Sequence, residues 1–167
     1  MILAIDPGKH ICGCAVFYPR GALAQVASTP TSEMDKFIAS LLVAHDSLTI
    51  VCERPKRRLN CRATFRDVDN LTAFADGLRS WRRAGGRGTL PSRAGGRVAA
   101  VRLVAPEDWK GQVPKIVHQA RIIDKLEPGE VRIVRPWMES DRNWKDICDA
   151  VGIGLWFVGR LEGTREP

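Results

Sequence analysis

The chain lacks the long hydrophobic runs and glycine-rich motifs that mark several common protein classes. No apolar stretch reaches the roughly 18 residues that a membrane helix needs. The N-terminal apolar run has no basic leader and is interrupted at Asp6, so it does not read as a signal peptide. No Gly-x-Gly-x-x-Gly follows a strand-like run and no Walker-type loop is present, which disfavours dinucleotide and P-loop nucleotide sites. We therefore expect a cytoplasmic protein with no membrane segment.

The cysteines also lack the spacing of a metal or redox motif. None of the five forms a Cys-x-x-Cys pair, which gives no sign of a zinc site. All but Cys61 lie in apolar segments, so we expect small, buried, reduced side chains at Cys12, Cys14, Cys52 and Cys148. This usage agrees with a reducing compartment.

Acidic residues are scarce in one third of the chain. Residues 54–102 hold 13 Lys or Arg and three Asp, a net charge of +10, whereas the whole chain carries +7 and the remainder therefore −3. A basic block beside a mildly acidic body predicts a polyanionic partner, with nucleic acid as the leading candidate. A solvated basic face with no partner remains the alternative.

Hydrophobic periodicity predicts an α/β chain that folds as one domain over residues 1–167. Expected strands lie at 1–5, 11–18, 22–27, 48–52 and 98–104, the first three as an antiparallel meander, with an optional short strand at 131–134. Expected helices lie at 32–44 with Ser32 as N-cap, at 60–83, at 114–126 beginning with Pro114 and ended by Pro128-Gly129, and at 142–160 capped by Ser140 or Asp141. The glycine- and arginine-rich segment 84–97 is expected to be a flexible basic loop. The result is a mixed five-stranded sheet flanked by helices.

Four carboxylates stand at informative places in this pattern. Asp6 and Glu53 each end an apolar strand, and Asp146 and Asp149 lie three apart on one face of the last helix. Separately, they could be a turn former, a solvent-facing strand end and partners of a helix dipole. Together they can converge, and like charges that close need a cation. Mg²⁺ prefers oxygen ligands, and two such ions about 4 Å apart can clamp a phosphoryl displacement.

The segments that carry these acids, ILAIDPG, VCERP and DICDAVGIGLW, resemble RuvC-type Holliday junction resolvases, which are metal-dependent nucleases of the ribonuclease H-like fold. The segment PEDWKGQVPKIVHQARI is similar to the phage-type branch, so the resemblance implies a bacterial or phage-encoded protein. It implies that Asp6, Glu53, Asp146 and Asp149 bind two Mg²⁺ ions, which Mn²⁺ can replace, and that Lys115 joins them in catalysis. It further implies a homodimer that cuts opposed strands of a four-way junction.

The chain departs from the cellular members of this family after the glutamate. Those members tend to carry an aromatic wedge there, whereas this chain has a basic run and its first aromatic residue is Phe65. Phosphate contacts position nucleic acid without reading sequence, which favours looser recognition of branched DNA. The residues expected to contact phosphate are Arg54, Lys56, Arg57, Arg58, Arg62 and Lys110.

The leading functional hypothesis is a magnesium-dependent, structure-selective DNA endonuclease, that is, a crossover junction endodeoxyribonuclease. A ribonuclease H-like nuclease that processes RNA is one alternative, although Glu53 is not characteristic of that type. A non-catalytic protein that binds branched DNA is another, although the presence of all four acids disfavours it. Trp109 and Trp144 are expected to be packing anchors, and the roles of His10 and His118 stay open.

Overall fold

The computed structural model describes residues 1–55, 65–83, 96–111, 113–140 and 143–162. Several sequence-based predictions concern residues outside these ranges. They include the phosphate contacts expected at Lys56, Arg57, Arg58 and Arg62, most of the expected loop 84–97, and the side chain of Cys61.

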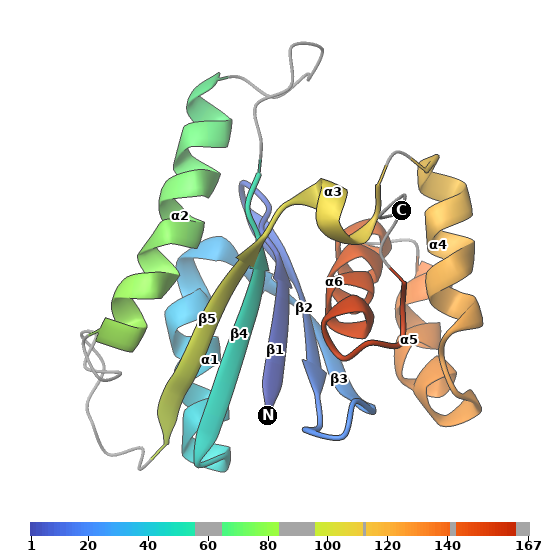
Figure 1. The fold of residues 1–167 in the computed structure, drawn as a ribbon, viewed down its shortest axis with the longest axis horizontal. Helices are drawn as coiled ribbons and strands as arrows, with labels where there is room; N and C mark the ends of the chain where they lie inside the picture. The colour runs from blue at the N-terminus through green and yellow to red at the C-terminus, as the bar shows by residue number, and fades with distance from the viewer. Residues whose placement is uncertain (56–64, 84–95, 112, 141–142, 163–167) are drawn as a thin grey trace.

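One five-stranded sheet forms the centre of the described structure (Figure 1). Its order is β3-β2-β1-β4-β5, with β1 antiparallel to β2, β2 antiparallel to β3, and the pairs β1–β4 and β4–β5 parallel. This order and these directions are those of the ribonuclease H-like fold, which confirms the expected fold class. The strands are β1 Ile2–Asp6, β2 Ile11–Phe17, β3 Leu23–Pro30, β4 Ser47–Glu53 and β5 Arg97–Val104.

The central strands are almost entirely apolar because both faces of the sheet are covered. Successive side chains of a strand point to opposite faces, and in β1 Ala4 packs into one hydrophobic cluster whereas Leu3 and Ile5 pack into the other. In β4 Val51 and Ile50 divide in the same way. The charged side chains of β1 and β4 stand only at the strand ends, at Asp6 and Glu53.

Helices cover the two faces unequally (Figure 1). One face is covered by α1 and α2, and the other by α6, against which α4 and α5 pack. The described helices are α1 Met34–Ala44, α2 Phe65–Arg83, α3 Pro106–Trp109, α4 Lys115–Asp124, α5 Pro128–Ser140 and α6 Trp144–Phe157, with a 3-10 turn at Thr31–Glu33. None of the described helices combines the length and the apolar character needed to cross a membrane.

The optional strand that the sequence predicts at 131–134 is wrong, and this segment is part of α5. Val134 is buried, and Val131, Trp137 and Met138 pack against the same core, which is helical spacing rather than strand alternation. Pro128 begins this helix, a position where proline removes no needed hydrogen bond. The short α3, which follows β5, has no counterpart among the predicted elements because a single helical turn carries almost no periodic signal.

The predicted N-caps also need correction. Ser32 lies in the 3-10 turn, and α1 begins after Glu33 with no side-chain cap. Pro114 is the N-cap of α4 rather than its first helical residue. Helix α6 begins after Asn143, whose left-handed backbone has a φ of 60°. Ser140 belongs to α5, and Asp141 lies outside the described residues.

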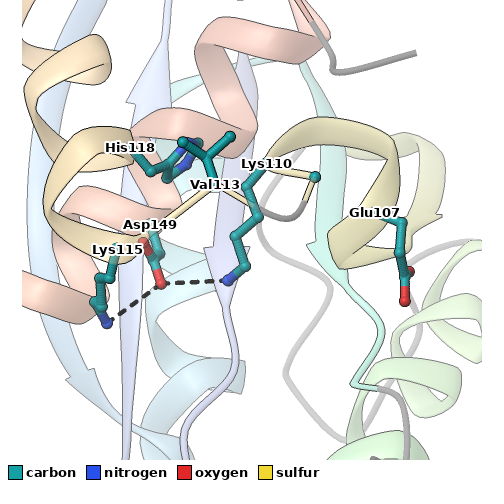
Figure 2. Close-up of a pocket in the computed structure, with 7 residues that line it drawn as sticks. Glu107, Lys110, Val113, Lys115, His118 and Asp149 are labelled. Carbon is teal, nitrogen blue, oxygen red and sulfur yellow. Dashed lines mark ion pairs between the residues drawn. The ribbon is translucent and has the colours of Figure 1, made fainter. Parts of the chain in front are cut away.

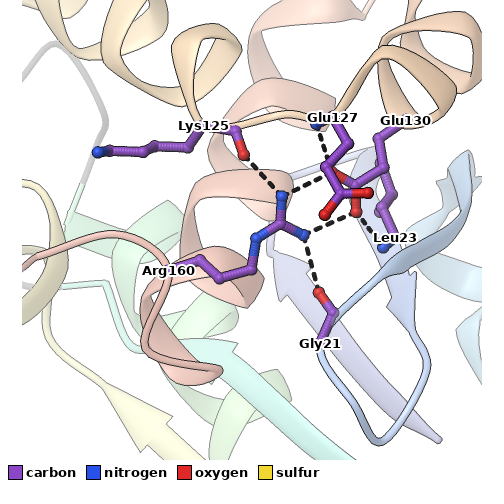
Figure 3. A network of polar contacts seen from close by, with 6 residues as sticks. All are labelled: Gly21, Leu23, Lys125, Glu127, Glu130 and Arg160. Atoms are coloured by element: carbon purple, nitrogen blue, oxygen red, sulfur yellow. Dashed lines mark hydrogen bonds and ion pairs between the residues drawn. The ribbon is translucent and has the colours of Figure 1, made fainter.

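A partly buried ion pair lies at the end of the sheet where β1 and β3 begin (Figure 3). Arg160 donates two hydrogen bonds of 2.7 Å to Glu130, and it also donates to the carbonyls of Gly21 and Lys125. Glu130 in turn accepts from the backbone N–H groups of Leu23 and Glu127. These contacts connect the start of α5 to the β2–β3 turn and to the residues that directly follow α6.

Candidate functional site

The parallel pairing of β1 and β4 brings Asp6 and Glu53 to the same edge of the sheet. Ile5 pairs with Cys52 in the register, so the acid that follows each of them lies at the carboxyl end of its strand. In open α/β sheets the carboxyl ends of strands are where ligands are usually bound. Glu53 is 8% exposed and Asp6 is partly buried.

Helix α6 reaches this edge because β2 carries a glycine opposite Asp6. Gly13 pairs with Asp6, and a Cβ atom at residue 13 would overlap the backbone carbonyl of Asp146. The first turn of α6 can therefore lie directly on β2 beside Asp6. Asp149 follows Asp146 by three residues and lies on the same helix face.

The electrostatics show that these four acids share one environment. Burial raises the pKa of Asp6 well above its usual value, and the charges of Glu53, Asp149 and Asp146 raise it further, whereas Lys110 opposes them. Burial and the charge of Asp149 also raise the pKa of Asp146, although Lys115 counteracts them. Burial and the neighbouring like charges therefore act together to disfavour the ionised form of Asp6 and Asp146.

Two lysines supply the partial neutralisation. Lys110 Nζ lies 3.5 Å from Glu53 Oε2 and 3.5 Å from Asp149 Oδ2. Lys115, the first residue of α4, lies 3.6 Å from the same Asp149 oxygen with half of its side chain exposed. Burial lowers the pKa of Lys110, but Glu53 and Asp149 more than offset that effect, so the pKa stays above its usual value.

Trp109 is a further partner of Glu53. Its indole Nε1 donates a 2.9 Å hydrogen bond to Glu53 Oε2, and the tryptophan is completely buried. Burial raises the pKa of Glu53, while Lys110 and this hydrogen bond lower it, and the net shift is upward. The burial of Trp109 and Trp144 confirms that both are packing anchors, but no local pattern in the sequence indicates the bond to Glu53.

A pocket of about 530 Å³ opens beside these groups (Figure 2). Its lining includes Glu107, Lys110, Val113, Lys115, His118 and Asp149. Figure 2 shows both lysines directed toward Asp149, with Glu107 directed away from it. His118 is buried with no hydrogen-bond partner at either ring nitrogen among the described residues, and burial lowers its pKa to about 4. The imidazole is therefore neutral near pH 7.

The donor set fits a divalent cation, although the described residues form no ready-made cage. Within these ranges, no three or more His, Cys, Asp or Glu side chains are placed so that they could together hold a metal ion. Lys110 lies between two of the acids and separates them. Asp149 Oδ1 is nevertheless buried with no hydrogen-bond partner in the described part of the chain, and unsatisfied carboxylate oxygens in a like-charged group are what a hard cation binds.

The residues expected to contact phosphate are only partly described. Arg54 is exposed and forms a 3.0 Å ion pair with Asp76 of α2, so it is tethered rather than free. Lys110 lies among the carboxylates, with a quarter of its side chain exposed, instead of on an open basic face. His10 is exposed and offers its backbone carbonyl to the Thr31 N–H, outside the pocket lining.

Trp109 and Gly13 are the site residues that sequence reasoning does not single out for this role. A usable signal exists for Trp109, because it follows β5, and β5 is parallel to the strand that ends at Glu53. Residues just beyond parallel strands share one sheet edge. Gly13 has no such signal, because its close approach to α6 depends on where a helix more than 130 residues later packs.

No family model matches the sequence, and no curated protein matches it either. Two solved structures of RuvC from Thermus thermophilus are similar in fold. One is 13% identical, covers 96% of this chain and 98% of that chain, and has a TM-score of 0.44. The other, in complex with a Holliday junction substrate, is 15% identical, covers 92% of this chain and 90% of that chain, and has a TM-score of 0.47. At these identities the likeness concerns the fold alone.

Proposed function

We propose that this protein is a magnesium-dependent, structure-selective DNA endonuclease that resolves Holliday junctions and other branched DNA. The observation that carries the proposal is the group of carboxylates gathered from β1, β4 and α6, with an unpartnered Asp149 oxygen among the described residues, two lysines and an open pocket beside it. Structural acids are normally paired. An underneutralised acid group at the carboxyl ends of parallel strands is instead typical of a catalytic site.

Asp6, Glu53, Asp146 and Asp149 would hold two Mg²⁺ ions, and Mn²⁺ would substitute for them. When bound, such ions activate water and neutralise charge as a phosphodiester is displaced. The protein's own contribution is to hold the acids on rigid strand and helix ends. Glu53 and Asp149 share Lys110 as a partner, so a cation held by these acids would compete with this lysine.

The two lysines would act on the nucleic acid. Lys115 is half exposed at the rim of the pocket, so its ammonium group can contact the scissile phosphate while remaining near Asp149. Lys110, once released from the acids, can do the same from the opposite wall. Point charges of this kind stabilise the negative charge that develops during phosphoryl transfer.

The charge distribution supports DNA as the partner. The block of residues 54–102 carries +10 and begins directly after Glu53 in the sequence, and such a block attracts a polyanion. Arg54, Lys56, Arg57, Arg58 and Arg62 are the phosphate contacts that we propose. A homodimer of the phage-type RuvC branch would place two such sites on opposed strands of one junction.

The direct test is cleavage of labelled four-way, three-way and flap DNA, and of RNA, in Mg²⁺. Asp6→Asn and Asp146→Asn should bind the junction but cut it about 10³-fold more slowly. The loss of a metal ligand removes several kcal/mol of transition-state charge stabilisation. Asp35→Asn, at an exposed position on α1, is the matched control and should cut normally. Normal cutting by both site variants would show that the metal-site assignment is wrong.

The same assay separates the alternatives. An RNA-processing nuclease would cut the RNA and spare the junction, whereas a non-catalytic protein would bind the junction and cut nothing. Replacing Arg57 and Arg58 with alanine should weaken binding and reduce the slope of log K against log salt by about 2, because each phosphate contact contributes about 0.9. An unchanged slope would remove both residues from the DNA interface. Sedimentation of the free protein tests the homodimer.

A further inference from the structure

Trp109 donates its indole hydrogen bond to a proposed metal ligand. The indole N–H points to Glu53 Oε2 across 2.9 Å, joining residues that are 56 positions apart in the chain. Both side chains are buried, at 0% and 8% exposure. A buried hydrogen bond from a neutral donor to a carboxylate is stronger than an ordinary one, because the acceptor is charged.

The indole ring is fixed by its neighbours, so the direction of its N–H is fixed as well. A Cβ at residue 152 would lie 2.6 Å from the ring, so only glycine lets α6 pass this close. The His118 ring meets the indole edge-on, with centroids 4.9 Å apart and planes 62° apart. Lys110 Nζ lies 4.8 Å from the centre of the ring. Residues from three parts of the chain therefore hold this one side chain in place.

We propose that Trp109 is a positioning residue, whose indole N–H orients the Glu53 carboxylate for cation binding. The inference rests on the proposed function, since it assumes that Glu53 is a metal ligand. A glutamate has several rotatable bonds, and holding it in one rotamer beforehand removes an entropy loss from the binding step. Polar partners of metal ligands typically change metal affinity by about 10- to 100-fold when they are removed.

The competing interpretation is that Trp109 only fills space in the core. Trp109→Phe separates the two, because it keeps an aromatic ring and removes the N–H. We expect this variant to bind Mn²⁺ about 10- to 100-fold more weakly, as measured by electron paramagnetic resonance or calorimetry without any substrate. Cleavage should recover as Mg²⁺ is raised, in contrast to Glu53→Gln, because only the position of the ligand is impaired. Trp137→Phe, half-buried on α5, is the matched control and should bind Mn²⁺ normally.

A second measurement does not depend on a folded Trp109 variant. The Trp109 indole proton of the wild-type protein, assigned by NMR, should be protected from exchange with solvent. Its resonance should move upfield in Glu53→Gln, because an amide is a weaker acceptor than a carboxylate. In the wild-type protein the same resonance should also move on addition of Mg²⁺. An indole signal that exchanges freely and ignores Glu53→Gln would overturn the inference.

The outcomes distinguish this inference from the proposed function. Failure of the wild-type protein to bind Mn²⁺ at all would overturn the proposed function and the role of Trp109 together. Normal Mn²⁺ binding by Trp109→Phe, alongside weakened binding by Glu53→Gln, would overturn the role of Trp109 alone.

Discussion

The carboxylates at the two ends of the sheet differ in how completely they are paired. At one end Glu130 accepts four hydrogen bonds, two from Arg160 and two from backbone N–H groups. At the other end, Asp6, Glu53, Asp146 and Asp149 share two lysines, and one oxygen of Asp149 has no partner among the described residues. At the first end one carboxylate is matched by one guanidinium group. At the second end, within the described part of the chain, four carboxylates have only two ammonium groups among them.

The pKa values follow this difference. Burial alone raises the pKa of Glu130, but the hydrogen bonds from Arg160 and the backbone outweigh it, so the pKa lies below its usual value. Burial and neighbouring acids raise the pKa of Asp6 well above its usual value. A fully paired acid stabilises the fold, and an acid that the protein leaves unpaired is available for a ligand. Substitutions at each end of the sheet test this contrast.

The largest effect on stability is expected at the paired end. Arg160→Ala leaves the Glu130 charge buried without its main partner, which should lower the free energy of unfolding by about 3 kcal/mol. The melting temperature should fall by about 6–12 °C for a chain of this size. Urea unfolding followed by circular dichroism measures this loss, and Mn²⁺ affinity below the transition should be unchanged.

Two further variants test whether the loss of stability is specific to the Arg160–Glu130 pair. Arg135→Ala, at an exposed position on α5, should change stability by less than about 0.5 kcal/mol. Asp6→Asn should stabilise the metal-free protein, because it removes one of several like charges. If Asp6→Asn instead destabilised the metal-free protein as much as Arg160→Ala does, the two ends would not differ in the way described.

The next largest effect is expected at Gly13. In Gly13→Ala the new methyl group would overlap the Asp146 carbonyl, so α6 must shift away from β2. Overpacking of this kind typically lowers stability by about 1–3 kcal/mol. The shift should also weaken Mn²⁺ binding, because Asp146 moves away from Asp6. Gly77→Ala on α2 is the control, since a Cβ there meets no atom within 4 Å. Unchanged Mn²⁺ affinity in Gly13→Ala would show that this contact does not position Asp146.

Replacement of Lys110 should strengthen metal binding, whereas Gly13→Ala should weaken it. Its ammonium group is the common partner of Glu53 and Asp149, so a cation must compete with it. We expect Lys110→Met to bind Mn²⁺ about tenfold more tightly, equivalent to about 1.4 kcal/mol, even if DNA cleavage falls. Calorimetry measures the affinity, with the exposed Lys36→Met as control. Weaker binding by Lys110→Met would mean that the lysine assists the cation instead of competing with it.

The smallest effect is a dependence of stability on pH that comes from Glu130. Its pKa in the folded protein is lowered from the usual 4.5, so its contribution is complete above that value and is lost as pH falls through the lower folded pKa. The stability difference between the wild-type protein and Glu130→Gln should therefore shrink as pH falls from about 5 to about 3. Urea unfolding at a series of pH values measures this difference. A difference that stays constant over this range would contradict the lowered pKa.

Much of the architecture follows from local pattern. The strands β1, β2, β4 and β5 are apolar or β-branched runs between turn-forming residues, and the predicted strands match them within a residue or two of their ends. Segment 131–134 misleads because three of its four residues are β-branched and apolar, whereas the residues that complete the helical stripe, Trp137 and Met138, lie further along. Local propensity favours a strand there, and packing against the core decides for a helix.

The acids of the site are identifiable because Asp6 and Glu53 end apolar strands and Asp146 and Asp149 lie three apart in an apolar helix. Chain order and strand direction are enough to bring Asp6 and Glu53 to one edge. The partners of these acids are not identifiable in the same way. Lys110 is predicted to contact a DNA phosphate, and its ion pairs with Glu53 and Asp149 leave no local pattern from which they could be predicted.

The sheet, its mixed strand direction and the four acids could be predicted from local pattern, because they depend on periodicity and on where charges interrupt apolar segments. Which acids have a charged partner and which are left open depends on tertiary packing. The contacts that decide it join Trp109 to Glu53, Lys110 to Asp149, and Arg160 to Glu130. Such contacts depend on how distant elements pack, and a residue pair separated by dozens of positions leaves no local periodicity from which the contact could be predicted.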